Sequence, residues 1–228
     1  MTRREPFLSR RPILVLAGTI SAALAALLLA SLVACSGRIE PLPFYRTAAL
    51  TPEWLTTREA DAPTVHRVAA FRMTDQHRAA VTERALQGKA TIVQFFFAAC
   101  GDVCPVTTTN VARVLAAAGA DARVQVLSYS VTPERDSVPA LQMFATMHGI
   151  TDVRWHLLTG NHDEMARLAR DSYFVRVGDG ATYGVTSIAH TESVVLVDAA
   201  GRIRGVYAGS LGLEMQRLRE DLETLLRS

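Results

Sequence analysis

The apolar residues of this chain fall into short continuous runs, separated by stretches in which they recur every three or four positions. The run ATIVQFFF at 90–97 is almost wholly apolar, which is typical of a central strand covered on both faces. Shorter runs predict further strands at 65–72, 123–131, 155–158, 193–198 and 202–207. The last two are separated by a turn at 199–201 and form a hairpin.

Four helices are expected around these strands. Pro105 suits the first turn of the first helix, and the helical spacing after it continues to Gly119. Asp136 or Ser137 caps the second helix, Gly149 ends it, and Asn161 begins the third. The inward positions of the four helices are Val111, Val114, Leu115 and Ala118; Leu141, Phe144, Ala145 and His148; Met165, Leu168 and Ala169; and Leu211, Met215, Leu218, Leu222 and Leu225.

Strands that alternate with helices predict an α/β fold with a central mixed sheet flanked by helices and some parallel pairing. A chain that closes with a β-hairpin and a helix has the order of a thioredoxin-like fold. The stretch 171–189 contains three glycines and no helical period, so it is expected to be a long, loosely held loop.

The N-terminus predicts export. A positive segment precedes a 22-residue apolar core, which ends in Leu32-Val33-Ala34 directly before Cys35. This resembles a bacterial lipoprotein signal, in which the cysteine is lipid-modified; the alternative is an uncleaved transmembrane anchor. Residues 1–35 are thus assigned to a signal or anchor, 36–63 to a tether and 64–228 to the folded domain. Both alternatives place the domain outside the cytoplasm, at a membrane of a bacterial cell envelope.

Charge excludes one class of partner. The formal net charge is +2, and removal of residues 1–35, with four arginines and one glutamate, leaves −1. No basic patch with interleaved aromatic residues is present in the sequence, so a nucleic acid is not expected as a partner.

The chain has three cysteines, and two of them stand close together as Cys100 and Cys104 in the stretch CGDVCP. They lie at the junction between the central strand and the helix that follows it. The unpaired N–H groups at the start of this helix favour thiolate. Thiolates exchange with disulfides and bind soft metals such as Cu(I). Outside the cytoplasm, two nearby thiols also tend to oxidise to a disulfide.

A Cu(I) site is expected to have a third ligand, and imidazole suits copper. Five of the six histidines are interpreted as surface or structural residues: His66, His77, His148, His156 and His162. His190 differs because it follows the long loop and stands just before the strand at 193–198. In a thioredoxin-like order the start of that strand faces the cysteine motif.

Several motifs together resemble the Sco/SenC family. CGDVCP is similar to the C-P-D-V-C-P motif of that family, and SYSVTPERDSV to its S-V-D-P-E-R-D-T stretch. WHLLTG at 155–160 matches W-x-x-L-T-G, and AHTESVVLVDAAGRIRG resembles the segment that supplies the copper histidine. LPFYRTAALTPEWL also looks like the lead-in of some bacterial members, so the resemblance runs from about Leu42 to the C-terminus.

The resemblance implies a membrane-attached, thioredoxin-fold copper protein that helps to assemble the binuclear copper centre of cytochrome c oxidase. Its copper ligands fall on Cys100, Cys104 and His190, and Asp102 is a candidate for supporting them. The sequence departs from the family pattern at Ala98, Gly101, Thr132 and Ala189. None of these departures removes a ligand, although the loss of two acids affects the surroundings of the site.

The expected function is therefore to carry copper, as Cu(I), Cu(II) or both, to the copper-site subunit of the oxidase. Other copper carriers and thiol reductants are the expected further partners. The main alternative is a thiol–disulfide oxidoreductase, which would need Cys100 and Cys104 but not His190. Zinc suits the same three ligands. A peroxidase is set aside because Phe97 occupies the position of its threonine. A purely structural disulfide is a weak alternative, because closing so short a loop restricts the unfolded chain little.

Two methionines form a further candidate site. Met143 and Met147 stand four residues apart on a predicted helix and invite interpretation as a copper-thioether pair. A methionine on a helical face more often belongs to the hydrophobic core, and both are predicted to be core residues.

Overall fold

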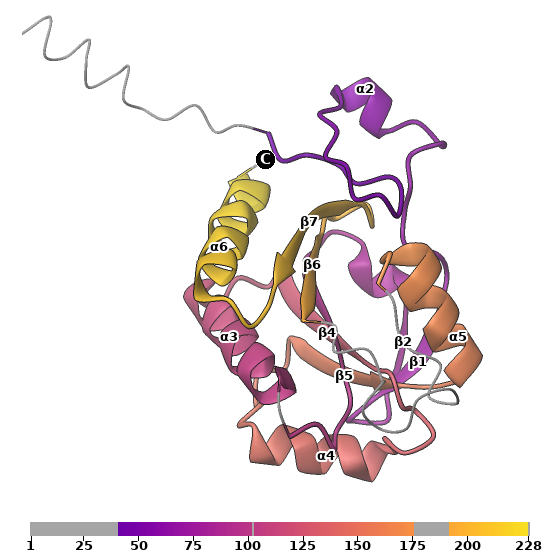
Figure 1. Ribbon diagram of the computed structural model, residues 1–228, viewed down its shortest axis with the longest axis vertical. Helices are drawn as coiled ribbons and strands as arrows, with labels where there is room; N and C mark the ends of the chain where they lie inside the picture. The colour runs from indigo at the N-terminus through magenta and orange to yellow at the C-terminus, as the bar shows by residue number, and fades with distance from the viewer. Residues whose placement is uncertain (1–40, 102, 176–191, 228) are drawn as a thin grey trace, which may run out of the picture. The chain divides into compact units, whose positions relative to one another are not determined.

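The computed structural model describes residues 41–101, 103–175 and 192–227. Seven strands form one mixed sheet in the order β2-β1-β5-β4-β3-β6-β7 (Figure 1). The strands are β1 (Arg72–Asp75), β2 (Ala80–Thr82), β3 (Ala90–Phe96), β4 (Val124–Ser130), β5 (Trp155–Thr159), β6 (Ser193–Val197) and β7 (Ile203–Ala208). The helices are α2 (Thr57–Ala60), η1 (Glu83–Leu86), α3 (Val103–Ala117), α4 (Val138–Met147), α5 (His162–Arg167), η2 (Leu168–Ser172) and α6 (Gly212–Arg227).

The central strands are buried on both faces, as their composition predicts. All seven residues of β3 and all seven of β4 are buried, and the two strands pair in parallel from Ala90↔Val124 to Phe96↔Ser130. Parallel pairing brings the carboxyl ends of β3 and β4 to the same edge of the sheet. β6 pairs antiparallel with β3, so its first residues lie at that edge as well.

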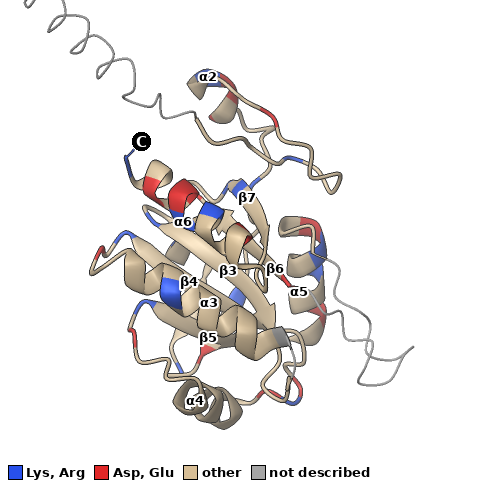
Figure 2. Ribbon diagram, turned by 60° about the vertical axis from the view of Figure 1, so that its left-hand side comes forward, with Lys and Arg blue, Asp and Glu red and all other residues tan. Residues whose placement is uncertain are grey.

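Helices cover both faces of the sheet. Helices α3, α4 and α6 pack into one core with the inward residues Leu115, Phe144 and Leu218, whereas α5 and η2 pack into the other with Met165 and Leu168. Figures 1 and 2 show α3 and α6 on one side of the sheet and α5 on the other. The thioredoxin-like α/β fold expected from the sequence is thus confirmed.

Most predicted elements occur at or near their predicted positions. Pro105 lies in the first turn of α3, Asn161 caps α5 through its side chain, and Gly119 and Gly149 follow α3 and α4 with positive φ angles. The strand at 65–72 was predicted wrongly: β1 begins only at Arg72. The buried residues before it, Val65, Val68 and Phe71, are spaced by three and dock into the core without a strand ladder.

Three predicted inward residues are also wrong, because Leu211, Met143 and Met147 are exposed. Leu211 precedes α6 and lies outside its buried stripe. Helix α4 has the sequence VPALQMFATM and carries no charged residue (Figure 2). Its inward face is filled by Leu141 and Phe144, both 0% exposed, and the two methionines lie on the other side of the helix.

The described residues of the predicted tether contact the domain. Leu42 and Phe44 are buried, and Phe44 forms an isolated β-bridge with Glu53. A capping box between Thr56 and Glu59 begins α2. Within the described residues, no helix combines the length and the apolar composition that crossing a membrane requires.

Candidate metal centre

The cysteine pair lies at the edge of the sheet where β3 and β4 end. Cys100 follows β3 after a short turn in which its own N–H donates to the carbonyl of Phe97, at 3.1 Å. Cys104 lies in the first turn of α3, where the backbone N–H groups have no helical carbonyl to bond. The N–H of Cys104 donates instead to the Sγ of Cys100, at 3.4 Å. Strand β3 and helix α3 therefore fix the two residues together.

Cys100 and Cys104 form a disulfide, and their Cα atoms are 5.9 Å apart. Each is 8% exposed, and both belong to the core that α3, α4 and α6 form on one face of the sheet. Once the disulfide is opened, the N-terminus of α3 favours the thiolate form of the cysteines. Its free N–H groups and the helix dipole stabilise negative charge. Two adjacent thiolates are the donor set that soft monovalent copper prefers.

A buried carboxylate braces the loop that leads to Cys100. Asp136 is 3% exposed, and its Oδ2 accepts hydrogen bonds from the Ser130 hydroxyl at 2.6 Å and the Thr132 hydroxyl at 3.1 Å. The same oxygen accepts the backbone N–H of Ala98 at 3.1 Å. The parallel register of β3 and β4 makes this contact possible, because it places the residues after Phe96 beside those after Ser130.

The sequence predicted Asp136 or Ser137 as the cap of helix α4, and the structure has Ser137 there. The Ser137 side chain makes no capping hydrogen bond, while Asp136 points toward the cysteine loop. The family pattern has an aspartate at position 132, whereas this chain has Thr132. The Thr132 hydroxyl group donates a hydrogen bond to the Asp136 carboxylate. The sequence carries no local signal for this role, because the role depends on the parallel register of β3 with β4.

The connection from β7 to α6 contacts helix α3 in the turns after Cys104. The Asn110 side chain donates to the carbonyl of Gly209 at 2.9 Å, and the Gly209 N–H donates to the carbonyl of Glu192. A Cβ at Gly209 would lie 2.6 Å from the Thr107 methyl group. Helix α3, the start of β6 and this connection are therefore in close contact just beyond the cysteines.

Of the predicted site residues, the structure brings together Cys100 and Cys104. His190, Asp102 and Cys35 lie outside the described residues. The other five histidines are described, and four of them contact protein groups: His66 lies 2.8 Å from the Ser172 carbonyl, His156 3.0 Å from Asp75, His162 3.3 Å from Glu134, and His148 against the Phe144 ring. His77 is exposed. Among the described residues, no three His, Cys, Asp or Glu side chains gather as a metal site.

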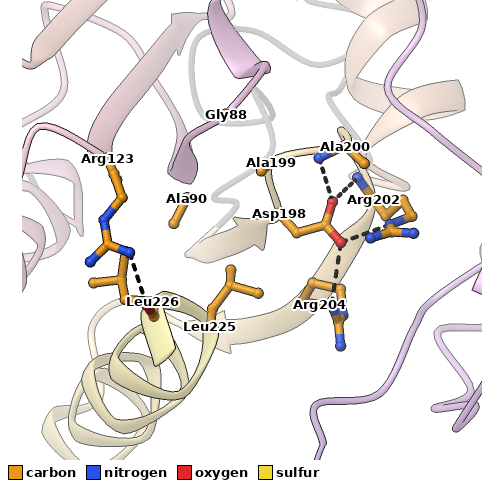
Figure 3. Close-up of a pocket in the computed structure, with 10 residues that line it drawn as sticks. All are labelled: Gly88, Ala90, Arg123, Asp198, Ala199, Ala200, Arg202, Arg204, Leu225 and Leu226. Atoms are coloured by element: carbon orange, nitrogen blue, oxygen red, sulfur yellow. Dashed lines mark hydrogen bonds and ion pairs between the residues drawn. The ribbon is translucent and has the colours of Figure 1, made fainter. Parts of the chain in front are cut away.

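A separate cavity of about 350 Å³ lies at the opposite end of β3, near Gly88 and Ala90 (Figure 3). Asp198 accepts hydrogen bonds there from Arg202 Nε at 2.7 Å and from an Arg204 terminal nitrogen at 3.2 Å. Arg204 also donates to the carbonyls of Leu42 and Pro43, at 2.6 and 3.0 Å. These guanidinium groups fasten the segment that precedes the domain, and the cysteine pair is not among the residues that line this cavity.

Comparison with known proteins decides the family. The family model described as SCO1/SenC matches residues 59–227, well over half of the chain. The chain belongs to the SCO1/SenC family. The match includes both cysteines, the Asp136 stretch and the strand that follows His190.

Solved structures of the family are similar in fold. A SCO1/SenC family lipoprotein from Bacillus anthracis is 25% identical, with a TM-score of 0.64 over 71% of this chain and 95% of that one. BsSco, described as a Sco-family cytochrome c oxidase assembly protein with a disulfide switch, is 25% identical, with a TM-score of 0.62 over 70% and 93%. Copper-bound ScoI from Bradyrhizobium japonicum is 29% identical, with a TM-score of 0.58 over 70% and 99%.

Proposed function

We propose that this protein binds copper on the outer side of a bacterial membrane and delivers or prepares it for the binuclear copper site of cytochrome c oxidase. The observation that carries the proposal is the pairing of Cys100 and Cys104, two buried sulfurs at the N-terminus of α3. This donor set suits Cu(I). The copper-bound ScoI relative and the oxidase-assembly relative BsSco support the metal and the client.

His190 is the proposed third ligand. The described chain resumes at Glu192, two residues after His190, and β6 then pairs with β3 from Val194↔Gln94. The chain therefore enters β6 at the edge where β3 ends and the cysteines follow. Two thiolates and one imidazole make a three-coordinate site that is open to a ligand from a partner, and copper passes to that partner by exchange of ligands.

The disulfide has a direct consequence for loading. Two sulfurs joined to each other offer no thiolate, so copper binds only after two electrons and two protons have opened the bond to two thiols. A thiol reductant outside the cytoplasm is therefore a proposed partner. Other copper carriers and the copper-site subunit of the oxidase are the proposed source and recipient of the metal.

Attachment to the membrane is proposed through a lipid on Cys35, or through an uncleaved apolar segment before it. The lipoprotein relative from Bacillus anthracis supports the first. Only residues 36–40 separate Cys35 from the part of the chain that packs on the domain. The folded unit would then stay close to the membrane surface, where the oxidase subunit also lies.

The test is a competition titration of the reduced full-length protein, in detergent, with Cu(I) and a chelator of known affinity. One copper should bind tightly, and Cys100→Ser and His190→Ala should each lose at least about tenfold in that affinity, equivalent to about 1.4 kcal/mol. His77→Ala is the matched control, because His77 is exposed and is not a proposed ligand. If His190→Ala binds copper as tightly as His77→Ala, the three-ligand site is wrong.

A second candidate, a thiol–disulfide oxidoreductase, is favoured by one specific observation: the pair is joined as a disulfide. In that reaction the two thiols of the pair become a disulfide while a disulfide of the client becomes two thiols, so electrons and protons balance. The activity would survive His190→Ala and disappear in Cys100→Ser. Reduction of a disulfide-bonded peptide by the two variants separates this function from copper binding.

A further inference from the structure

Two methionine side chains stand exposed on the outer face of α4. Met143 is 66% exposed and Met147 is 64% exposed. They are four residues apart, so their Cβ atoms are about 5–6 Å apart on one face of the helix. Methionine side chains are long, unbranched and flexible, which allows two thioether sulfurs at this spacing to approach one point.

Packing does not explain the pair. The inward face of α4 is complete without it, because Leu141 and Phe144 are 0% exposed and the Phe144 ring lies 4.7 Å from the ring of Phe96. Three other methionines of the chain, Met73, Met165 and Met215, are at most 5% exposed and do serve the core. Leaving two methionines in water forgoes the stabilisation that burial of an apolar side chain provides.

The surroundings of the pair favour a cation. The whole of α4 lacks charged side chains, so no Lys or Arg on this helix repels a positive ion (Figure 2). The exposed residues beside the methionines are the uncharged Pro139, Gln142 and Thr146. Met147 is the last residue of the ten-residue helix, where the carbonyl groups carry partial negative charge.

We propose that Met143 and Met147 form a second, surface site for a soft monovalent cation, which is Cu(I) if the proposed function holds. Thioethers select Cu(I) over the harder divalent metals. Two neutral sulfurs bind more weakly than the cysteine pair does, and the remaining coordination positions stay open to solvent or to a donor. Copper enters and leaves such a site by ligand exchange, without a change in its oxidation state.

The test uses Ag(I), a redox-inert stand-in for Cu(I), and the full-length protein with Cys100→Ser and Cys104→Ser, so that the cysteine site cannot contribute. The methionine methyl groups are labelled with ¹³C and followed by NMR in chloride-free buffer. The signals of Met143 and Met147 should move together and saturate, while those of Met73, Met165 and Met215 stay in place. If the two exposed signals do not move, the site is disproved.

Two variants complete the test. Met147→Leu keeps the size and the apolar character of the side chain, and it should weaken the response of the Met143 signal about tenfold or more. An unchanged response would show that the two sulfurs act separately and would overturn the paired site. His148→Gln should leave both signals responding as before, because the His148 ring lies against Phe144 at 4.2 Å; loss of the response would assign the ion to the histidine instead. Because the cysteines are absent, none of these outcomes depends on the copper titration that tests the proposed function.

Discussion

The carboxylate of Asp136 accepts the backbone N–H of Ala98 at 3.1 Å, two residues before Cys100. This contact ties the loop after β4 to the loop that positions the first cysteine. The hydroxyl groups of Ser130 and Thr132 donate to the same oxygen, so three donors meet one buried acceptor.

Asp136→Asn should therefore weaken both stability and copper binding. The neutral amide oxygen of Asn is a weaker acceptor for the three donors than a carboxylate oxygen, because charge-assisted hydrogen bonds are roughly twice as strong as neutral ones, so the substitution should cost about 1–3 kcal/mol. Urea unfolding and the Cu(I) competition titration measure the two effects. Glu134→Gln is the matched control, because it removes the same charge from an exposed side chain two residues away. Equal behaviour of the two variants would show that Asp136 does not brace the site.

The elements that the sequence predicted well are those whose signal is local. Strand β3 is a continuous apolar run, and α3 has both Pro105 in its first turn and a regular inward stripe. Their junction carries the cysteine pair, so two of the three proposed ligands followed from one stretch of sequence. The role of Asp136 did not, because it depends on the parallel register of β3 with β4, which only the folded sheet supplies.

Helix α4 shows a different limit of prediction from sequence. Its sequence has no charged residue, so no charged face distinguishes the inside from the outside, and several registers of the helix satisfy the same periodicity. The contact of Phe144 with Phe96 selects the register in which Met143 and Met147 face water. The segment at 65–71 failed as a strand for a related reason: its buried residues are held by neighbours distant in sequence, such as Gly201, whose carbonyl accepts the N–H of Val68.

Gly209 should not tolerate a side chain, whereas Gly101 should tolerate one. A Cβ at Gly209 would lie 2.6 Å from the Thr107 methyl group, 2.7 Å from Val194 and 2.9 Å from the Glu192 carbonyl. Gly209→Ala should therefore cost about 1–3 kcal/mol of unfolding free energy, as overpacking does. A Cβ at Gly101 meets nothing within 4 Å, so Gly101→Ala should be neutral or stabilising, by at most about 1 kcal/mol. Denaturant unfolding of both variants checks this, and a stable Gly209→Ala protein would contradict the packing of α3 on the connection before α6.

Alkaline pH should destabilise the fold through its buried tyrosines. Burial raises the pKa of Tyr207, whose hydroxyl donates to Asp221 at 2.6 Å, well above the ordinary range, and it does the same for Tyr129 and Tyr173. An unfolded chain ionises its tyrosines near pH 10. Above that pH the unfolded state therefore holds fewer protons than the native state, and stability falls as the pH rises.

The measurement is tyrosinate absorbance recorded beside circular dichroism along a titration to high pH. The absorbance of the buried tyrosines should rise only as the helical signal is lost. Tyr207→Phe should remove one tyrosine from that step. Ionisation of all tyrosines while the secondary structure persists would be incompatible with the burial described for them.

Arg204 should hold residues 42–53 on the domain. Its guanidinium lies 3.9 Å from the centre of the Phe44 ring and donates to the carbonyls of Leu42 and Pro43. Hydrogen bonds from a charged donor are worth about 1.5–3 kcal/mol, so Arg204→Gln should speed amide exchange at Phe44 and Glu53 about ten- to a hundredfold. Arg46→Gln removes a guanidinium that is 39% exposed, and it should change the exchange at most a few-fold. Equal exchange rates in the two variants would refute the anchoring role of Arg204.

Reduction of the Cys100–Cys104 disulfide should leave the protein folded, and copper should then restore more stability than the reduction removes. The cysteines are only four residues apart, so the chain-entropy contribution of the bond is about 2 kcal/mol, equivalent to about 4–8 °C in Tm for a domain of this size. A ligand that binds only the native state adds about 4 kcal/mol at a thousand times its Kd. In thermal unfolding, the reduced protein should thus have the lowest Tm, the oxidised protein a higher one and the reduced Cu(I)-loaded protein the highest. Cys100→Ser should show a smaller rise with Cu(I) than the parent protein, because it lacks one of the two thiolates and binds copper more weakly. A reduced protein that is unfolded without metal would mean that the pair is a structural staple, since a carrier that gives up its copper has to remain folded.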